Sequence, residues 1–298
     1  MSAILVAGVA VLDFVFHMEN FPRVAEKYRA DGAAISGGGN AANAAVAIAR
    51  LGGGTELAAR LGVDQIADMI VSDLEKENVG TALIKQYPGC RSSFSSIYID
   101  GEGERQIMNY RDNQLPWDAD WIATSAPDNM VAALADTRWP DGALAAMQCA
   151  NVRGVPGIMD AEAPVLEAEQ AVHAASHVAF SAQGAVDFTG QQNIDEAALR
   201  AAEILPGKVI VADGENGVVM VQDQVARRFP AFEIDPVDTL GAGDIWHGAF
   251  ALALGEGMSE EMAIPFASAA AAIKCSRTGG REGAPSRQEV LQFLKERT

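Results

Sequence analysis

The stretch DPVDTLGAGDIWHGAFALAL, residues 235–254, places three small residues directly before a carboxylate and a mostly apolar run. The run is typical of a buried helix, so Gly241, Ala242 and Gly243 lie where that helix should begin. A helix start leaves backbone N–H groups without intrahelical partners, and glycine lets a ligand approach them closely. Because the peptide dipoles also favour negative charge there, the segment predicts an anion hole for a phosphate or a developing oxyanion.

Asp244 follows these residues and has two interpretations. A carboxylate in the first helical turn often only complements the helix dipole, which contributes less than about 1 kcal/mol. A carboxylate beside an anion hole also repels the anion, which suits a general base that takes a proton from a hydroxyl attacking phosphorus. The residues DTLGAGD by themselves leave both interpretations open.

A second group of candidate residues occurs in SGGGNAANAAVAIARLGG, residues 36–53. Asn40 and Asn43 lie in the first turn of an expected helix, and each amide can donate and accept hydrogen bonds, which suits sugar hydroxyls. For Asn40 alone, an N-cap is the simpler interpretation. The pair of amides, with Asp13 in the same half of the chain, favours a polyol site.

The same segment also fits a dinucleotide fingerprint, because Gly37, Gly39 and Ala42 have the G-x-G-x-x-A spacing. The fingerprint should directly follow the first hydrophobic strand, whereas RADGAAIS precedes it here. An NAD-dependent oxidoreductase is therefore the weaker alternative, and separate titrations of NADH and ATP would distinguish the two.

The composition excludes several classes of function. The chain has 298 residues, of which 49% are hydrophobic, enough for one large α/β domain or two medium ones. Its formal net charge of -18 argues against a broad nucleic-acid or anionic-membrane surface. Cys90, Cys149 and Cys275 are widely spaced without a C-x-x-C pair, so neither a disulfide framework nor a zinc site is indicated. We expect a cytoplasmic protein with no nucleic-acid or membrane partner.

Apolar strand-like runs alternate with alanine-rich helical stretches along the chain. The runs are AILVAGVAVL, GIMD, HVAFS and KVIVAD, and the helical stretches are Asn40 to Leu51, Ile66 to Glu77 and Glu196 to Leu205. This alternation predicts βαβ units and a parallel sheet covered by helices, the α/β class. The N-terminal run has no basic region and is interrupted by Asp13, so we interpret it as the first strand and not as a membrane span.

Two stretches break the alternation, residues 14–34 and 94–112. SSFSSIYIDGEGERQIMNY has the pattern of a hairpin that turns at Gly101 to Gly103. We expect both stretches to form a small β-sheet lid on one domain spanning residues 1–298, because no linker, low-complexity tract or repeat divides the chain. Further short strands are expected at Phe232 to Val237 and at Met130 to Ala135.

Together, the two glycine segments resemble the signatures of the PfkB, or ribokinase-like, family of sugar kinases. GGGNAANAAVAIARLGG is similar to the helix entry in the first third of those proteins, and DTLGAGD to their D-T-x-G-A-G-D stretch. The resemblance covers the whole chain. It implies a three-layer ribokinase-like fold, a mostly parallel sheet flanked by helices with a small β-sheet lid over the substrate.

The resemblance also implies roles for individual residues, with Asp244 as the catalytic base. The other implied sets are the anion hole, at Gly241, Ala242 and Gly243; the sugar site, at Asp13, Gly39 and Asn43, to which the pair of amides adds Asn40; and the nucleotide contacts, at Gly214, Gly217, Thr239, Gly241 and Gly243.

Shorter stretches indicate the substrate. GGNAAN resembles the ketohexokinase form of the first signature, and EKYRA, RQIMNY, ADTRWPDGA and IKCSRTGGREGAP resemble bacterial sulfofructose kinases. In those enzymes a lysine, an asparagine and an arginine recognise the sulfonate of the sugar, and the matching residues are Lys27, Asn109 and Arg138. A guanidinium suits a tetrahedral oxyanion, although an ordinary surface arginine, or one paired with Asp136, is the alternative.

The sequence departs from the family pattern at two places. The N-x-x-E element, which helps to organise magnesium and phosphates in the family, falls at Ser181 and Gly184. The nucleotide loop T-x-G-x-x-G reads ADGENG and lacks the threonine. The metal ligands are therefore unknown from the sequence. The four histidines have no metal-site spacing, and Glu260 and Glu261 are expected to form a solvated helix start.

We expect an ATP-dependent kinase for a primary hydroxyl of a small sugar, a ketohexose or an anionic ketose such as sulfofructose, with magnesium as cofactor. The alternatives are a nucleoside or other PfkB-type substrate, the oxidoreductase above, and a catalytically silent sugar-binding protein. Activation by a monovalent cation and assembly into a homodimer through the lid are left open.

Overall fold

The larger of two β-sheets lies at the centre of the structure, a computed structural model that describes residues 2–297. Its nine strands are β1 (Ala3–Ala7), β4 (Gly54–Gly62), β5 (Ile84–Tyr87), β8 (Met130–Asp136), β9 (Gly157–Ala161), β10 (His177–Ser181), β11 (Lys208–Ala212), β12 (Val218–Gln222) and β13 (Val225–Phe229). They lie in the order β13-β12-β11-β10-β9-β8-β1-β4-β5. All neighbours are parallel except the pairs that include β12, so the expected mostly parallel sheet is confirmed.

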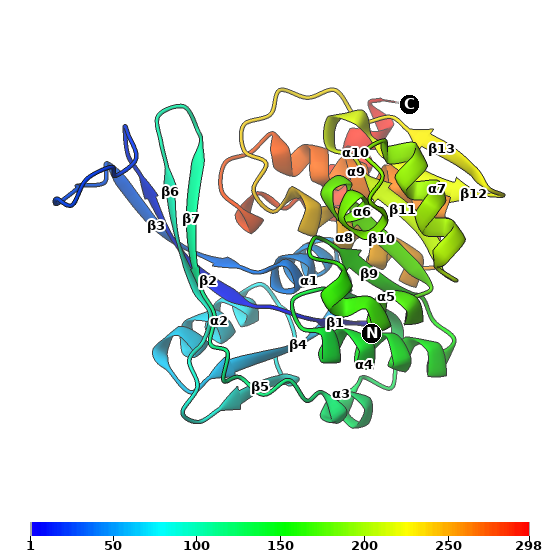
Figure 1. Ribbon diagram of the computed structural model, residues 1–298, viewed down its shortest axis with the longest axis horizontal. Helices are drawn as coiled ribbons and strands as arrows, with labels where there is room; N and C mark the ends of the chain where they lie inside the picture. The colour runs from blue at the N-terminus through cyan, green and yellow to red at the C-terminus, as the bar shows by residue number, and fades with distance from the viewer. Residues whose placement is uncertain (1, 298) are drawn as a thin grey trace.

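Helices cover both faces of this sheet (Figure 1). They are α1 (Asn40–Arg50), α2 (Gln65–Lys76), α3 (Asp120–Ser125), α4 (Pro140–Arg153), α5 (Glu169–Ala174), α6 (Ala182–Thr189), α7 (Ile194–Ile204), α8 (Ala242–Gly255), α9 (Glu260–Cys275) and α10 (Arg287–Lys295). Successive side chains of a strand point to opposite faces, so Ile4 and Val6 of β1 pack with α1, α2, α8, α9 and α10, whereas Leu5 and Ala7 pack with α3 to α7. The fold therefore has three layers and two cores.

The smaller sheet forms the lid and projects from one side of the body (Figure 1). Its strands are β2 (Val11–His17), β3 (Gly32–Gly38), β6 (Phe94–Ile99) and β7 (Arg105–Tyr110), in the order β3-β2-β6-β7. The expected hairpin is β6–β7, and Gly103 lies in its turn with a φ of 83°. The lid strands extend beyond the predicted stretches, because β2 begins at Val11 and β3 continues to Gly38.

The apolar run at the N-terminus is not one strand, as the sequence suggested, but two strands in different sheets. The backbone N–H of Gly8 donates to Ala58 in the body, and the next N–H, that of Val9, donates to the Asp136 carboxylate at 2.8 Å. The chain therefore leaves the larger sheet at Gly8 and enters the lid as β2. Hydrophobicity alone cannot show this break, because both strands are apolar.

Two other expectations were wrong. Residues 232–237 form no strand, and the N–H groups of Val237 and Asp238 donate instead to the carbonyl oxygen of Cys275 at the end of α9. Glu260 does begin a helix, but it is not simply solvated, because it accepts hydrogen bonds from Lys208 and lies 3.0 Å from the His177 ring. These contacts draw together the start of α9 and the sheet.

The predicted helices agree with α1, α2 and α7 to within two residues at each end. Within residues 2–297, no helix is long and apolar enough to cross a membrane.

Candidate active site

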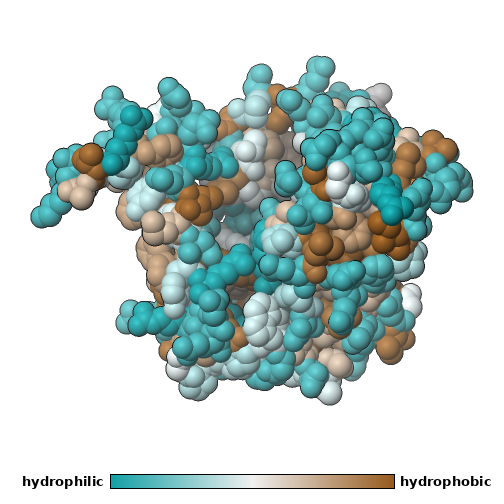
Figure 2. Space-filling view, viewed as in Figure 1, coloured by the Kyte–Doolittle hydropathy of each residue, from teal (hydrophilic) through white to brown (hydrophobic). Residues whose placement is uncertain are grey.

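A cavity of about 1120 Å³ lies between the lid and the body, where the carboxyl ends of β1, β8 and β9 meet. Figure 2 shows it as a hollow in the surface beside the lid. Most residues that the sequence predicted to bind the sugar or the transferred phosphate line this cavity: Asp13, Gly39, Asn40, Asn43, Asn109, Arg138, Thr239, Gly241, Ala242, Gly243 and Asp244. Residues from distant parts of the sequence therefore converge at the edge of the sheet where open α/β folds bind ligands.

The start of α8 has the geometry that an anion hole requires. Gly241 is its N-cap residue, with a φ of 74° that favours glycine, and the helix begins at Ala242. The first-turn N–H groups of Gly243 and Asp244 point out of the helix end toward the cavity side, where the helix dipole is positive. The loop before the helix is held by Asp238, which accepts from the N–H groups of Leu240 and Gly279.

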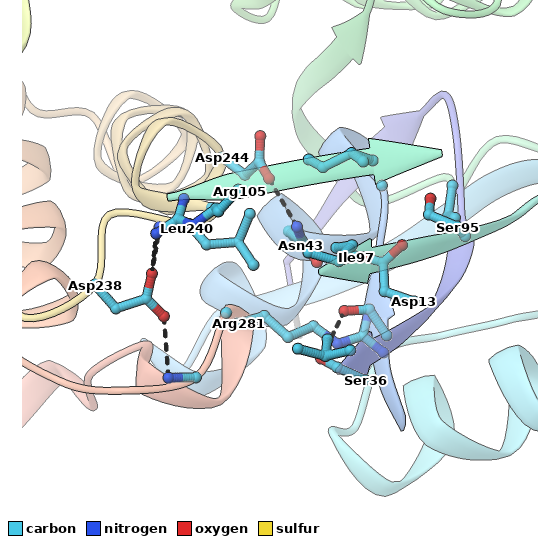
Figure 3. Close-up of a pocket in the computed structure, with 18 of the residues that line it drawn as sticks. Asp13, Ser36, Asn43, Ser95, Ile97, Arg105, Asp238, Leu240, Asp244 and Arg281 are labelled. Carbon is cyan, nitrogen blue, oxygen red and sulfur yellow. Dashed lines mark hydrogen bonds and ion pairs between the residues drawn. The ribbon is translucent and has the colours of Figure 1, made fainter. Parts of the chain in front are cut away.

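Close packing of two helices brings Asp244 to its hydrogen-bond partner. Gly248 of α8 faces α1, and a Cβ at this position would lie only 2.5 Å from the carbonyl oxygen of Ala44. The missing side chain lets the helices approach, and Asn43 Nδ2 then donates to Asp244 Oδ2 at 2.7 Å (Figure 3). The close packing of α1 and α8 therefore gives a carboxylate oriented by an amide.

The electrostatic surroundings of Asp244 raise its proton affinity. Burial raises the pKa of Asp244 well above its ordinary value, and the neighbouring Asp160 raises it further, whereas the hydrogen bond from Asn43 lowers it. A carboxylate with a raised pKa is a stronger base once it is ionised. Glu162 and Asp136 act in the same direction as Asp160.

The sugar-site candidates come from the lid and from α1. Asp13, on β2, faces the cavity beside Ser95 of β6 (Figure 3), and burial raises its pKa. Asn43 is buried, and its Oδ1 atom has no hydrogen-bond partner within residues 2–297. Asn40 is not an N-cap, because Gly39 occupies that position and the Asn40 amide donates to Glu162 at 3.0 Å.

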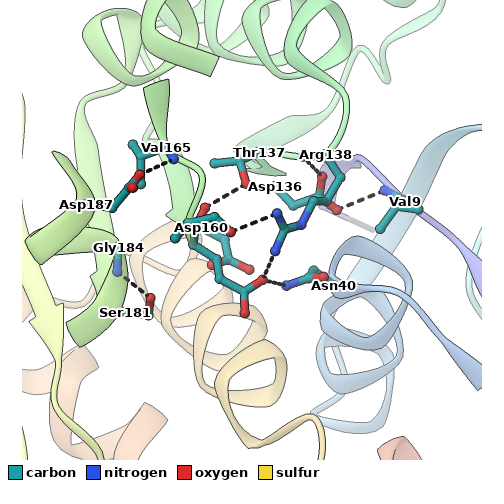
Figure 4. Close-up of polar contacts among 12 residues, drawn as sticks. Val9, Asn40, Asp136, Thr137, Arg138, Asp160, Val165, Ser181, Gly184 and Asp187 are labelled. Carbon is teal, nitrogen blue, oxygen red and sulfur yellow. Dashed lines mark hydrogen bonds and ion pairs between the residues drawn. The ribbon is translucent and has the colours of Figure 1, made fainter. Parts of the chain in front are cut away.

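Asp136 organises the backbone beneath the cavity (Figure 4). Its carboxylate accepts from the N–H groups of Val9, Ala41 and Arg138, at 2.8, 3.1 and 2.9 Å. It therefore fixes the crossing from β1 into the lid and the start of α1 at the same time. Burial raises the pKa of Asp136 to about 6, although the three N–H groups lower it. Arg138 does not pair with this carboxylate through its guanidinium.

The three residues expected to hold an anionic end group are not equally placed. Asn109 lines the cavity and donates to Ser95 Oγ at 3.0 Å. Arg138 also lines it, and its guanidinium donates to Ala163 at 2.8 Å and to Glu162 at 2.6 Å (Figure 4). Lys27 is exposed in the loop between β2 and β3 and does not line the cavity. A contact between Lys27 and the substrate therefore stays a prediction.

Sequence reasoning missed several charged residues of the cavity wall. Arg105 of β7 forms an ion pair with Asp238 at 2.6 Å, which joins the lid to the loop before α8. A second connection joins Ser36 Oγ to Glu282 at 2.7 Å. Arg111 lines the cavity just beyond β7. The alternation of RQIMNYR could have indicated one face of a strand with Arg105 and Arg111, but not what that face meets.

His247 does not face the cavity, and it packs inside the body. Its Nδ1 lies 2.8 Å from the carbonyl oxygen of Gly243, and its Nε2 lies 3.1 Å from that of Ala179. The side chain joins the first turn of α8 to β10, so we assign it a structural role.

The departure from N-x-x-E has a steric basis. Ser181 is the N-cap of α6, and its hydroxyl accepts from the N–H of Gly184 (Figure 4). A Cβ at Gly184 would lie 2.0 Å from the carbonyl oxygen of Ala161, so a glutamate does not fit there without a backbone shift. Within residues 2–297, no group of three or more His, Cys, Asp or Glu residues could hold a metal ion. The described residues therefore offer no cage of three or more protein ligands for a magnesium ion.

The predicted nucleotide contacts are only partly in the cavity. Thr239 lines it beside the anion hole, whereas Gly214 and Gly217 lie outside it, in the turn between β11 and β12. Gly214 begins a short 3-10 helix, Gly214–Asn216, and Gly217 follows it.

Comparisons with known proteins show the family and the fold of this chain. The family profile described as pfkB family carbohydrate kinase matches residues 1–287. The ribokinase of Bacillus subtilis is 28% identical over 299 residues, which cover 99% of this chain and 100% of that protein. A ribokinase from Thermotoga maritima has a structure that is 28% identical, with a TM-score of 0.86 over 99% of this chain and 100% of its own. The Arabidopsis thaliana ribokinase, solved with ribose and ATP, is 23% identical, with a TM-score of 0.87 over 99% of each chain.

Proposed function

The chain belongs to the pfkB family of carbohydrate kinases and is a sugar kinase, and we propose that it transfers the γ-phosphoryl group of ATP to a primary hydroxyl of a ketohexose or an anionic ketose such as sulfofructose. The observation that carries the proposal is the placement of Asp244. It lies at the start of α8, in the cavity, with a hydrogen bond from Asn43 and an anion-binding helix end beside it.

In this proposal Asp244 removes the proton from the attacking hydroxyl. Its raised pKa suits it to hold that proton as the oxygen attacks phosphorus. The N–H groups at the start of α8 stabilise the negative charge of the transferred phosphoryl group, because they are oriented before the reaction begins. Asn43 fixes the direction in which the carboxylate points.

The sugar would be bound from both sides of the cavity. Asp13 accepts hydrogen bonds from sugar hydroxyls on the lid side, and its raised pKa indicates that it is partly desolvated before any ligand binds. Asn43 Oδ1 is a buried acceptor without a partner in the described residues, and a hydroxyl would satisfy it. Gly39 lets the chain pass close to Val9 at the start of α1, because a Cβ there would lie 2.4 Å from the carbonyl oxygen of Val9.

ATP is proposed as the donor because of the anion hole and the likeness to a ribokinase solved with ATP. Thr239, Gly241 and Gly243 would contact its phosphates, and Gly214 and Gly217 its nucleoside end. Magnesium commonly binds through substrate phosphates and one or two carboxylates, so it would arrive with the nucleotide and not in a protein cage. Activation by a monovalent cation stays a prediction.

The remaining parts of the proposal concern assembly. We propose that residues 1–298 form one kinase domain with a lid, which the Arg105–Asp238 ion pair and the Ser36–Glu282 hydrogen bond hold over the cavity. Closure of the lid would exclude water and limit ATP hydrolysis. The outer face of the lid exposes Met108 and Tyr110, which could pack against a second copy in a homodimer. A cytoplasmic location is expected for such an enzyme.

The specificity for an anionic ketose is supported by the guanidinium and amide groups at one end of the cavity, those of Arg138 and Asn109. ADP release should be measured with ribose, fructose, sulfofructose and a nucleoside. The proposal expects the highest kcat/KM for a ketose. Faster turnover of ribose or a nucleoside would contradict the assigned substrate class. Tight sugar binding without turnover of any of them would instead favour a silent sugar-binding protein.

A further inference from the structure

Arg111 belongs to the cavity-facing side of the lid. Four residues at alternate positions line the cavity, Arg105, Ile107, Asn109 and Arg111. Alternate residues of an extended strand lie on one face, so the row continues one position beyond the end of β7 at Tyr110. Arg111 is thus placed beside Asn109 where the chain passes from the lid to the body.

Arg111 and Arg138 differ in how they are paired. Arg138 forms an ion pair with Glu162 at 2.6 Å and donates to the carbonyl oxygen of Ala163. The Arg111 side chain makes no hydrogen bond or ion pair with any other residue between 2 and 297. Because Glu162 pairs with Arg138, Arg111 is the one of these two guanidinium groups that has no ion-pair partner within residues 2–297.

The surroundings of Arg111 favour an anion. Its side chain is exposed because the cavity is open, but the nearby protein desolvates it enough to lower its pKa, and the Arg138 guanidinium lowers the pKa further. Asp136, Glu162 and Glu167 act in the opposite direction. An oxyanion between the two guanidinium groups would relieve their repulsion and supply the acceptor that Arg111 lacks.

We propose that Arg111 is the residue that makes this kinase specific for a ketose with a singly charged end group, a sulfonate or a carboxylate. Arg111 and Asn109 bind the group from the lid, and Arg138 binds it from the body. A singly charged group matches the one guanidinium without an ion-pair partner, whereas a phosphate group carries about -1.5 to -2 charges at neutral pH. This inference rests on the proposed function, since it names the residue that selects the substrate of the same site.

Binding of the anionic end group should also affect the closure of the lid. A group held by Arg111 and Arg138 connects the lid to the body, so an anionic sugar would favour closure more than a neutral sugar of the same shape. Discrimination against fructose would then appear in kcat as well as in KM.

The test compares the wild type with Arg111→Gln and Arg111→Lys. The measured quantity is the ratio of kcat/KM for sulfofructose to kcat/KM for fructose, with a ketose carboxylate and fructose 6-phosphate as further substrates. Removing a charged hydrogen-bond donor should lower the ratio about 10-fold to 100-fold in Arg111→Gln, and less in Arg111→Lys. Arg200→Gln is the matched control, because Arg200 lies on helix α7, pairs with Glu203 and does not line the cavity.

The outcomes distinguish a failure of the Arg111 assignment from a failure of the proposed function. If the wild type prefers sulfofructose but Arg111→Gln keeps the wild-type ratio, the role of Arg111 is refuted and the proposed function stands. If the wild type prefers fructose to both singly charged sugars, the anionic branch of the proposed function fails, and this inference fails with it. A higher wild-type kcat/KM for fructose 6-phosphate than for either singly charged ketose would overturn the assignment of the charge. The better of the sulfonate and the carboxylate identifies the end group.

Discussion

Replacing Asn43 should move the pH dependence of the reaction. Asn43 Nδ2 donates to Asp244 Oδ2 at 2.7 Å, and this hydrogen bond lowers the pKa of Asp244 against the effects of burial and Asp160. Asp244 must be ionised to act as a base, so the rate rises as the pH increases through its pKa. Without the donor the charged form is less stable, and the rise occurs at higher pH.

The size of the shift follows from the kind of hydrogen bond that is lost. A hydrogen bond to a charged group contributes about 1.5 to 3 kcal/mol, and about 1.4 kcal/mol corresponds to one pH unit. We therefore expect Asn43→Ala to move the acid limb of the kcat/KM profile up by about one to two pH units. Alanine is a good helix former, so α1 should be retained.

The assay is ADP release measured over a range of pH values with a saturating nucleotide. Asn151→Ala is the control, because Asn151 lies in α4, its amide donates to the carbonyl oxygen of Ala174, and it does not line the cavity. It should leave the acid limb where it is in the wild type. A profile for Asn43→Ala that falls only in height, with an unchanged acid limb, would refute the idea that Asn43 tunes Asp244 and would leave it only a contact for the sugar.

Two further perturbations test the parts that support the site. Arg105→Ala removes the 2.6 Å ion pair with Asp238 that joins the lid to the body, so we expect KM for the sugar to rise about 3-fold to 10-fold, with a melting temperature close to that of the wild type; an unchanged KM would show that the pair does not hold the lid. Asp136→Asn replaces an acceptor of three backbone N–H groups with an amide that can accept only through its oxygen, and denaturant unfolding should show a loss of about 1 to 3 kcal/mol. The pKa of Asp136 is raised in the folded state from 3.8 to about 6, so its contribution to stability is present at low pH and is lost as the pH rises through about 6. This pH-dependent part of the stability should be absent in Asp136→Asn. A variant as stable as the wild type, with the same pH dependence, would contradict the clamping role.

Local sequence signals predicted the helix start that lines the candidate site. The run Gly241 to Asp244, followed by apolar residues, predicted a helix start, and α8 begins at Ala242. The hairpin β6–β7 and the alternation of strands and helices were also predictable. These features depend on neighbouring residues, so one segment carries enough information to specify them.

The pairings across the cavity could not be predicted in the same way. Asn43 and Asp244 are 201 residues apart in the sequence, and Val9 and Asp136 are 127 apart. Nothing in the segment around one member of a pair points to the other member. Their partners depend on which strands become neighbours, and this is decided by the packing of the whole sheet. The same limit explains why the break between β1 and β2 and the position of Arg111 were missed.

The contrast between Arg138 and Lys27 shows where resemblance alone is insufficient. Both match a sulfonate-binding pattern, but Arg138 is held in the cavity by Glu162, whereas Lys27 is exposed in a loop that lies outside it. At Gly184 the sequence departs from the family pattern, and the structure gives the cause. The carbonyl oxygen of Ala161 lies too close to this position for a side chain.

The central claim is that Asp244 is the catalytic base, and Asp244→Asn tests it most directly. The amide has the shape of the carboxylate and leaves the start of α8 intact, but it cannot accept the hydroxyl proton. Phosphoryl transfer should fall about 100-fold to 10,000-fold, while the dissociation constants for ATP and sugar, measured by calorimetry, stay within a few-fold of the wild type. A variant that keeps more than about half of the wild-type rate would show that Asp244 is only a helix-start carboxylate and would contradict the account.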